Sequence, residues 1–282
     1  MRYNTLIDVN TLHAHLNDPH WVVVDCRFNL MDAEAGRRAY RESHLPSARY
    51  AHLDEDLSSP ITPTTGRHPL PDPGQLARKL GEWGIGPETQ VVAYDDMGGM
   101  LAAARLWWLL RWLGHQAAAV LNGGFPAWQR AGLPLTTEPP TVQPTVFTGQ
   151  PDDRLWLTTA QILALPSANV LLDARTSARF RGEMEPIDPV AGHIPGAVNL
   201  PTEGHLMADG YFLPHTELRA RFIAALGERS PTTVVHSCGS GVTACHNLLA
   251  METAGLHGSR LYAGSWSEWI RDPGRPVATG AD

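Results

Sequence analysis

The residue types best suited to covalent chemistry lie in one short stretch, residues 236–245, which reads His-Ser-Cys-Gly-Ser-Gly-Val-Thr-Ala-Cys. Cys238 follows a short apolar run and precedes a helical pattern from Val242 to Ala254, so we expect it where a buried strand turns into a helix. The first N–H groups of a helix lack intrahelical partners, and the helix dipole adds partial positive charge there. Such a turn favours a thiolate or a bound anion, and Gly239 and Gly241 let the loop curl around it. The stretch predicts that Cys238 is a nucleophile.

Two further side chains of this stretch have less certain chemistry by themselves. The Ser240 hydroxyl could relay a proton or hold a substrate carbonyl, but it could equally be a small loop residue. Cys245 follows Cys238 by seven positions, and a helical rise of about 1.5 Å per residue places the two Cα atoms roughly 10 Å apart. That distance exceeds disulfide reach, so we expect Cys245 to lie on a buried helix face.

Composition restricts the possible partners. The chain has 282 residues, a net charge of −7 and no basic run, which argues against nucleic acid and anionic membranes as partners. No apolar stretch approaches the ~20 residues of a membrane span, and the N-terminus lacks the apolar core of a signal peptide. Three cysteines make a disulfide framework improbable and favour a reducing cytoplasm.

Four short blocks occur twice, in the same order and at nearly constant spacing. They are an apolar strand ending in Asp-x-Arg, a His-(Leu/Ile)-Pro-x-Ala turn, a second apolar strand, and a Gly-containing turn followed by tryptophan. The paired blocks are 21–27 with 170–175, 44–48 with 193–197, 91–96 with 233–238, and 121–128 with 261–269. This order predicts two homologous domains, with Asp96 of the first in the place of Cys238 of the second.

Each copy alternates short apolar runs with helical segments, such as that from Leu101 to Leu113. This alternation predicts an α/β fold in which each domain has a mainly parallel sheet with helices on both faces. Ligands of such sheets bind beyond the carboxyl ends of the strands, where Cys238 is expected. The predicted domains are 1–138 and 156–282, joined by a proline-rich linker at 139–155. A second proline-rich excursion, 58–73, is too long for a simple turn and suggests a functional loop.

These motifs resemble those of the tandem rhodanese-type sulfurtransferases over nearly the whole chain. The loop from Cys238 to Thr243 is similar to that of 3-mercaptopyruvate sulfurtransferases, whereas rhodaneses that use thiosulfate generally carry basic residues after the cysteine. The resemblance implies two five-stranded rhodanese-like domains, of which the first is catalytically silent. We expect neither a cofactor nor a metal.

The resemblance further implies the roles of individual residues. Cys238 would accept sulfur as a persulfide, and Ser240 would work with a histidine and an aspartate that match His68 and Asp56, with Asp54 as a competitor for Asp56. The remaining expected substrate-binding positions of the loop are Gly239, Gly241, Val242 and Thr243.

Arg179 matches the family's substrate arginine, and its guanidinium suits a carboxylate or an oxyanion. A second family arginine is replaced by Ile187, unless Arg181 or Arg67 substitutes for it. The neutral loop favours 3-mercaptopyruvate as the sulfur donor, while the replaced arginine leaves thiosulfate as an alternative. The expected acceptor is a small thiol, a thioredoxin-like protein, cyanide or sulfite.

Other classes of function fit the residues less well. Phosphatases that share this fold need an arginine where this chain has Ala244. The spacing of the cysteines disfavours a zinc site, and the loop lacks the third glycine of a dinucleotide fingerprint. A non-enzymatic sulfur-carrier or scaffold module is the remaining alternative, although such modules usually lose the cysteine.

Overall fold

The computed structural model describes residues 2–281, which group into two compact units. Unit 1 comprises the residues up to Ser59, Leu70–Asp152 and Met207–Phe212. Unit 2 comprises Pro60–Pro69, Asp153–Leu206 and the residues from Leu213 onward. The boundaries at 138 and 155 stay predictions. The segment 60–69 belongs to unit 2, and the segment 207–212 belongs to unit 1. The sequence pattern did not predict these two assignments.

Unit 1 contains a five-stranded parallel sheet with the strand order β1-β5-β4-β2-β3. Its elements are β1 (Leu6–Ile7), α1 (Val9–Ala14), β2 (Trp21–Asp25), α2 (Ala35–Glu42), β3 (Arg49–Tyr50), α3 (Pro73–Glu82), β4 (Gln90–Tyr94), α4 (Ala102–Trp112), β5 (Ala118–Leu121) and α5 (Gly124–Arg130).

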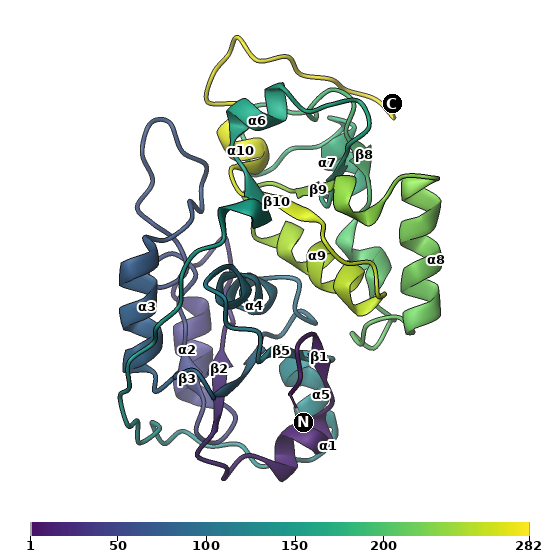
Figure 1. The fold of residues 1–282 in the computed structure, drawn as a ribbon. Coiled ribbons are helices and arrows are strands. Elements are labelled where there is room, and N and C mark those ends of the chain that lie inside the picture. The colour runs from purple at the N-terminus through teal and green to yellow at the C-terminus, as the bar shows by residue number, and fades with distance from the viewer. Residues whose placement is uncertain (1, 282) are drawn as a thin grey trace. The chain divides into compact units, whose positions relative to one another are not determined.

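Alternating apolar residues explain how helices cover both faces of this sheet. Val23 and Val92 pack with Leu12 of α1 and Trp128 of α5 in one hydrophobic cluster. Helix α4 packs against β4 and β5, and its arginine-containing segment is buried almost throughout. Figure 1 shows these helices around the strands of unit 1.

Unit 2 repeats this architecture with the strand order β6-β10-β9-β7-β8, and its strands are also parallel. Its elements are η1 (Asp153–Leu155), β6 (Trp156–Leu157), α6 (Thr159–Leu163), β7 (Val170–Asp173), α7 (Ser177–Phe180), β8 (Val198–Asn199), η2 (Thr202–His205), α8 (His215–Leu226), η3 (Pro231–Thr233), β9 (Val234–Ser237), α9 (Thr243–Thr253), β10 (Arg260–Tyr262) and α10 (Ser265–Trp269).

The two faces of this second sheet also carry different residues. Val235 of β9 faces a hydrophobic cluster that includes Ile162 of α6 and Trp266 of α10. His236, the next residue of β9, lies on the other face, near Phe222 of α8, and is fully buried. The predicted α/β fold with two five-stranded parallel sheets is thus confirmed.

The register of the two sheets corrects one sequence prediction. Asp173 of β7 pairs with Ser237 of β9, and the equivalent Asp25 of β2 pairs with Tyr94 of β4. The residue after Tyr94 is Asp95, so the prediction that Asp96 matches Cys238 is wrong by one position. Sequence spacing could not reveal this, because adjacent acidic residues fit the motif equally well.

Within residues 2–281, no helix combines the length and the apolar character needed to cross a bilayer.

Candidate active site

Cys238 lies directly after β9, at the carboxyl end of the unit 2 sheet, and only 2% of it is exposed. The backbone N–H of Gly241 donates a hydrogen bond of 3.2 Å to its Sγ. The peptide of Cys238 is held as well, because its N–H donates to Ser265 Oγ at 3.0 Å and its C=O accepts from the N–H of Trp266 at 3.0 Å. The sulfur therefore sits in a rigid turn with a backbone donor aimed at it, which favours a negative charge on sulfur.

Gly241 is required for this turn. Its φ is +77°, and a Cβ at this position would lie 2.2 Å from the carbonyl oxygen of Ala263. Behind the turn, the Cys245 thiol of α9 donates to the Gly241 carbonyl at 3.3 Å. Cys245 is fully buried, as predicted for a helix face.

We expect Gly241→Ala to displace the loop and to lower transfer from any donor strongly. Gly196 is a matched control, because its φ is +79° and nothing lies within 4 Å of a Cβ there. Gly196→Ala thus adds only the strain of a positive φ, roughly 1 kcal/mol. Assays of sulfur transfer and thermal unfolding of both variants would test this. Equal losses of activity would contradict a steric role for Gly241.

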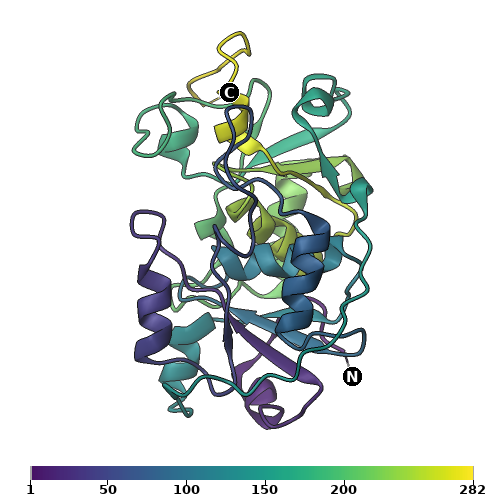
Figure 2. The same ribbon diagram turned by 90° about the vertical axis from the view of Figure 1, so that its left-hand side faces the viewer.

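The segment 60–69, which lies far from Cys238 in the sequence, contributes a side chain to the Cys238 loop. His68 Nδ1 lies 2.7 Å from Ser240 Oγ, and both residues are buried. The segment is fixed against α10, since the N–H of Arg67 donates to Ser267 Oγ at 3.0 Å and Arg271 Nε donates to the Thr65 carbonyl at 2.9 Å. Figure 2 shows this dark blue segment beside the yellow C-terminal helix. The expected pairing of His68 with Ser240 is therefore present in unit 2.

Asp56, the predicted third member of this relay, belongs to unit 1. Its Oδ2 accepts the N–H of His52 at 2.8 Å, and its Oδ1 lies 2.9 Å from Lys79 Nζ. The competing residue, Asp54, is exposed. The partnership of Asp56 with His68 stays a prediction.

Two arginines of unit 2 flank the loop. A Cβ added to Gly239 would lie 2.9 Å from Arg67 Nη2 and 3.5 Å from Arg179 Nη2. Asp188 joins the two, because its Oδ1 is paired with Arg67 Nη1 and its Oδ2 lies 3.0 Å from Arg179 Nη2. Arg67 and Arg179 therefore both lie beside Gly239, whereas Arg181 pairs with the exposed carboxylate of Glu183.

Carboxylates hold this arrangement in place. The Nε–H of Arg179 is shared between the two carboxylate oxygens of Glu185, at 3.0 and 3.1 Å. Glu185 also accepts the backbone N–H groups of Ile187 and Asp188. Burial acts to raise the pKa of Glu185, but these hydrogen bonds outweigh it and lower that pKa. Burial raises the pKa of Asp188, and the guanidinium groups of Arg67 and Arg179 counteract that rise.

Two residues of the site escaped the sequence analysis. Ser265, at the start of α10, has a φ of +51° and accepts the N–H of Cys238, but a lone serine after a glycine carries no recognisable signal. Asp188 directly follows Ile187, which replaces the second family arginine, so an acidic residue next to that position was the signal in the sequence.

The equivalent loop of unit 1 holds a carboxylate in place of the thiol. Asp95 is fully buried, and its oxygens accept backbone N–H groups from Met97, Gly99 and Leu101 at 2.7 to 3.1 Å. Burial raises its pKa to about 6, although these hydrogen bonds act to lower it. The loop geometry of this fold therefore accommodates an anionic group, but in unit 1 that group is not a nucleophilic sulfur.

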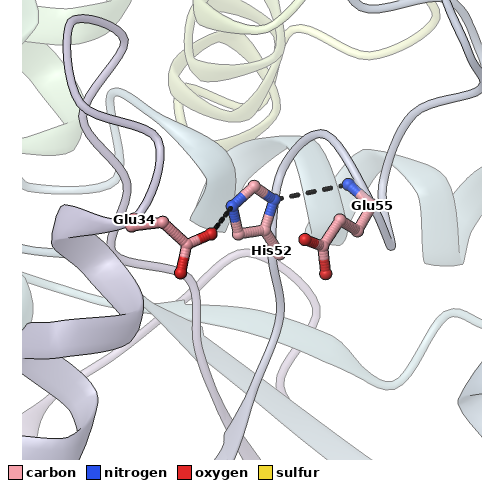
Figure 3. Close-up of side chains that lie close together, drawn as sticks. All are labelled: Glu34, His52 and Glu55. Carbon is pink, nitrogen blue, oxygen red and sulfur yellow. Dashed lines mark hydrogen bonds and ion pairs between the residues drawn. The ribbon is translucent and has the colours of Figure 1, made fainter.

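Unit 1 also contains a cluster with the composition of a metal site, shown in Figure 3. Ligand atoms of Glu34, His52 and Glu55 lie within 4.8 Å of one another. Arg37 contacts both glutamates, at 3.2 Å and 2.6 Å, so its guanidinium supplies the cation between them. His52 Nδ1 accepts the N–H of Glu55 at 3.3 Å. The cluster is accounted for as an ion-pair network.

The chain is similar in sequence to a known domain family and to named proteins. The rhodanese-like domain family matches residues 8–131 and 158–272. A protein of Pseudomonas aeruginosa named "Probable 3-mercaptopyruvate sulfurtransferase" is 52% identical over 280 residues, 98% of each chain. "Thiosulfate sulfurtransferase" of Rattus norvegicus is 36% identical and covers 90% of this chain and 86% of its own.

A solved structure is similar as well. The structure of 3-mercaptopyruvate sulfurtransferase from Leishmania major superposes with a TM-score of 0.85 at 33% identity, covering 96% of this chain and 76% of that one. The family match and these relatives cover most of the chain, and the chain therefore belongs to the rhodanese family.

Proposed function

We propose that this protein is a sulfurtransferase that moves a sulfane sulfur from 3-mercaptopyruvate to an acceptor through a persulfide on Cys238. The observation that carries the proposal is the pairing, in one loop, of a backbone N–H on the Cys238 sulfur with a His68–Ser240 hydrogen bond. The name of the 52% identical relative supports the choice of donor.

In the first half-reaction the Cys238 thiolate attacks the sulfur of the donor. An S–S bond forms, the C–S bond of the donor breaks, and its electron pair leaves on carbon as the enolate of pyruvate. The enolate takes up one proton, equivalent to that of the donor thiol, so the products are pyruvate and the anionic persulfide. The backbone N–H of Gly241 stabilises negative charge on sulfur at this position.

The second half-reaction regenerates the thiolate. The acceptor attacks the outer sulfur of the persulfide, a new bond forms to the acceptor, and the S–S bond returns its electron pair to Cys238. A thiol acceptor becomes a persulfide, and cyanide becomes thiocyanate. Small thiols and thioredoxin-like proteins are the proposed acceptors. A reducing cytoplasm is the proposed location, and it suits cysteines that form no disulfide within residues 2–281.

Ser240 and His68 are proposed to supply the proton that the enolate needs. The 2.7 Å contact allows the hydroxyl to donate to the substrate while His68 replaces its proton. Asp56 is proposed to orient His68, and the loop backbone from Gly239 to Thr243 is proposed to bind the donor.

We expect Ser240→Ala to lower kcat for 3-mercaptopyruvate by about 10²-fold, the lower range for a positioned general acid. Thiosulfate should be affected much less, because its leaving group, sulfite, departs without needing a proton on carbon. Steady-state assays with both donors and cyanide would measure this. Equal slowing with the two donors would contradict a proton-relay role.

The second candidate function is thiosulfate sulfurtransferase, and the two arginines beside Gly239 favour it. A direct comparison of kcat/KM for the two donors decides between them, and mass spectrometry of the protein after incubation with donor alone would reveal the persulfide. If neither donor yields thiocyanate and Cys238 gains no sulfur, the enzymatic proposal fails and the scaffold alternative stands.

A further inference from the structure

The donor subsite beside Cys238 has unused hydrogen-bond donors. Within residues 2–281, Arg67 Nη2 and Arg179 Nη1 have no hydrogen-bond partner, and both lie within 3.7 Å of a Cβ placed on Gly239. These N–H groups lie beside Gly239, the residue that follows the proposed nucleophile Cys238. They can receive the carboxylate of a donor whose sulfur lies at Cys238.

The charge around these donors is balanced. Three arginines meet three carboxylates in one continuous chain of ion pairs, Asp173–Arg175–Glu185–Arg179–Asp188–Arg67. Among the described residues 2–281, Asp188 alone forms ion pairs with both arginines that face the loop, and 2% of its side chain is exposed. Asp188 therefore cancels positive charge at the point where a donor would bind.

This balance bears differently on the two candidate donors. The Cys238 thiolate repels any anion that approaches it, and a balanced subsite offers no net positive charge to offset that repulsion. 3-Mercaptopyruvate carries one negative charge, whereas thiosulfate carries two. The second charge is thus disfavoured, even though both anions can use the same N–H groups.

We propose that Asp188 is a specificity-determining residue, which neutralises the Arg67–Arg179 pair and so favours a monoanionic donor over a dianionic one. Arg67 is the second carboxylate-binding arginine, supplied by the segment 60–69 in place of the side chain at Ile187. The inference rests on the proposed function, because it concerns the donor of that reaction.

Asp188→Asn keeps the shape of the side chain and removes its charge. We expect the ratio of kcat/KM for thiosulfate to kcat/KM for 3-mercaptopyruvate to rise by about tenfold, since a dianion gains more than a monoanion from one added positive charge. Glu183→Gln is the matched control: it removes a carboxylate of the same segment, but that carboxylate is exposed and pairs with the half-buried Arg181. The ratio should not change in this control.

Arg67→Gln tests the opposite change. It should raise KM for 3-mercaptopyruvate and lower the ratio of kcat/KM for thiosulfate to kcat/KM for 3-mercaptopyruvate. The double variant with Asp188→Asn should return this ratio toward that of the wild type. If Asp188 and Arg67 had only structural roles, both single variants would shift the ratio of kcat/KM values in the same direction, because each would loosen the same loop. Opposite shifts with restoration in the double variant would support the inference.

The same assays separate failure of the inference from failure of the proposed function. A wild-type protein that produces no thiocyanate from either donor would overturn the proposed function. A wild-type protein that turns over both donors, with a ratio unchanged in Asp188→Asn and Arg67→Gln, would overturn the role of Asp188 alone.

Discussion

Cys238→Ser is expected to reduce sulfur transfer from both donors to the background rate. A serine hydroxyl is a far weaker nucleophile than a thiolate at neutral pH, and it cannot form the S–S bond that stores the transferred sulfur. The loop should survive the change, because its backbone is held by Ser265, Trp266 and Ser267 rather than by the sulfur. Thiocyanate production with each donor would measure the loss.

Cys26→Ser is the matched control for this prediction. Cys26 is also fully buried at the end of a strand, but it lies in unit 1, and its thiol donates to the Val24 carbonyl at 3.8 Å. Burial raises the pKa of the Cys26 thiol well above its ordinary value, so it is a poor nucleophile. Mass spectrometry after incubation with donor should show one added sulfur atom in Cys26→Ser and none in Cys238→Ser. Transfer at the wild-type rate in Cys238→Ser would mean that another group is the nucleophile.

Acid is expected to destabilise the protein through the buried histidines of unit 2. His236 lies inside the sheet face that α8 and α9 cover, and burial lowers its pKa to about 3. His205 stacks on Phe222 with ring centroids 4.9 Å apart, and burial, together with the neighbouring His246, lowers its pKa well below the ordinary value. Both side chains are therefore neutral in the folded protein at pH 7.

The sign of the effect follows from proton binding. An unfolded chain protonates these histidines near pH 6.5, whereas the folded chain resists protonation of His236 until about pH 3. The contribution of His236 to stability is complete above pH 6.5 and is lost progressively as the pH falls toward 3, and His205 acts in the same direction. In that window protonation of His236 in the unfolded chain lowers the free energy of unfolding by about 1.4 kcal/mol per pH unit.

Urea unfolding between pH 7.5 and pH 4.5 would measure this loss, and variants would separate it from the titration of carboxylates. His236→Gln should have a shallower pH dependence, by about 1.4 kcal/mol per pH unit. His257→Gln is the control, because His257 is exposed and pairs with Glu252 at the surface. Identical slopes in the wild type and in His236→Gln would contradict the prediction.

The local sequence determined much of this protein. Short apolar periods, glycines and four blocks that each occur twice predict the two copies of the fold, the helix after Cys238 and the position of the thiol at a strand end. These features are local, because strand and helix periodicity and turn chemistry are written in neighbouring residues.

Residue patterns alone did not show which distant side chains accompany Cys238. The His68–Ser240 contact joins residues 172 positions apart and was expected only from the family resemblance, whereas the pairing of Arg67 with Asp188 across 121 positions is known only from the tertiary structure. The segment 60–69 has no periodic pattern, so periodicity does not indicate where it packs. Strand register, which replaced Asp96 by Asp95 as the equivalent of Cys238, likewise depends on hydrogen bonds between strands rather than on either strand alone.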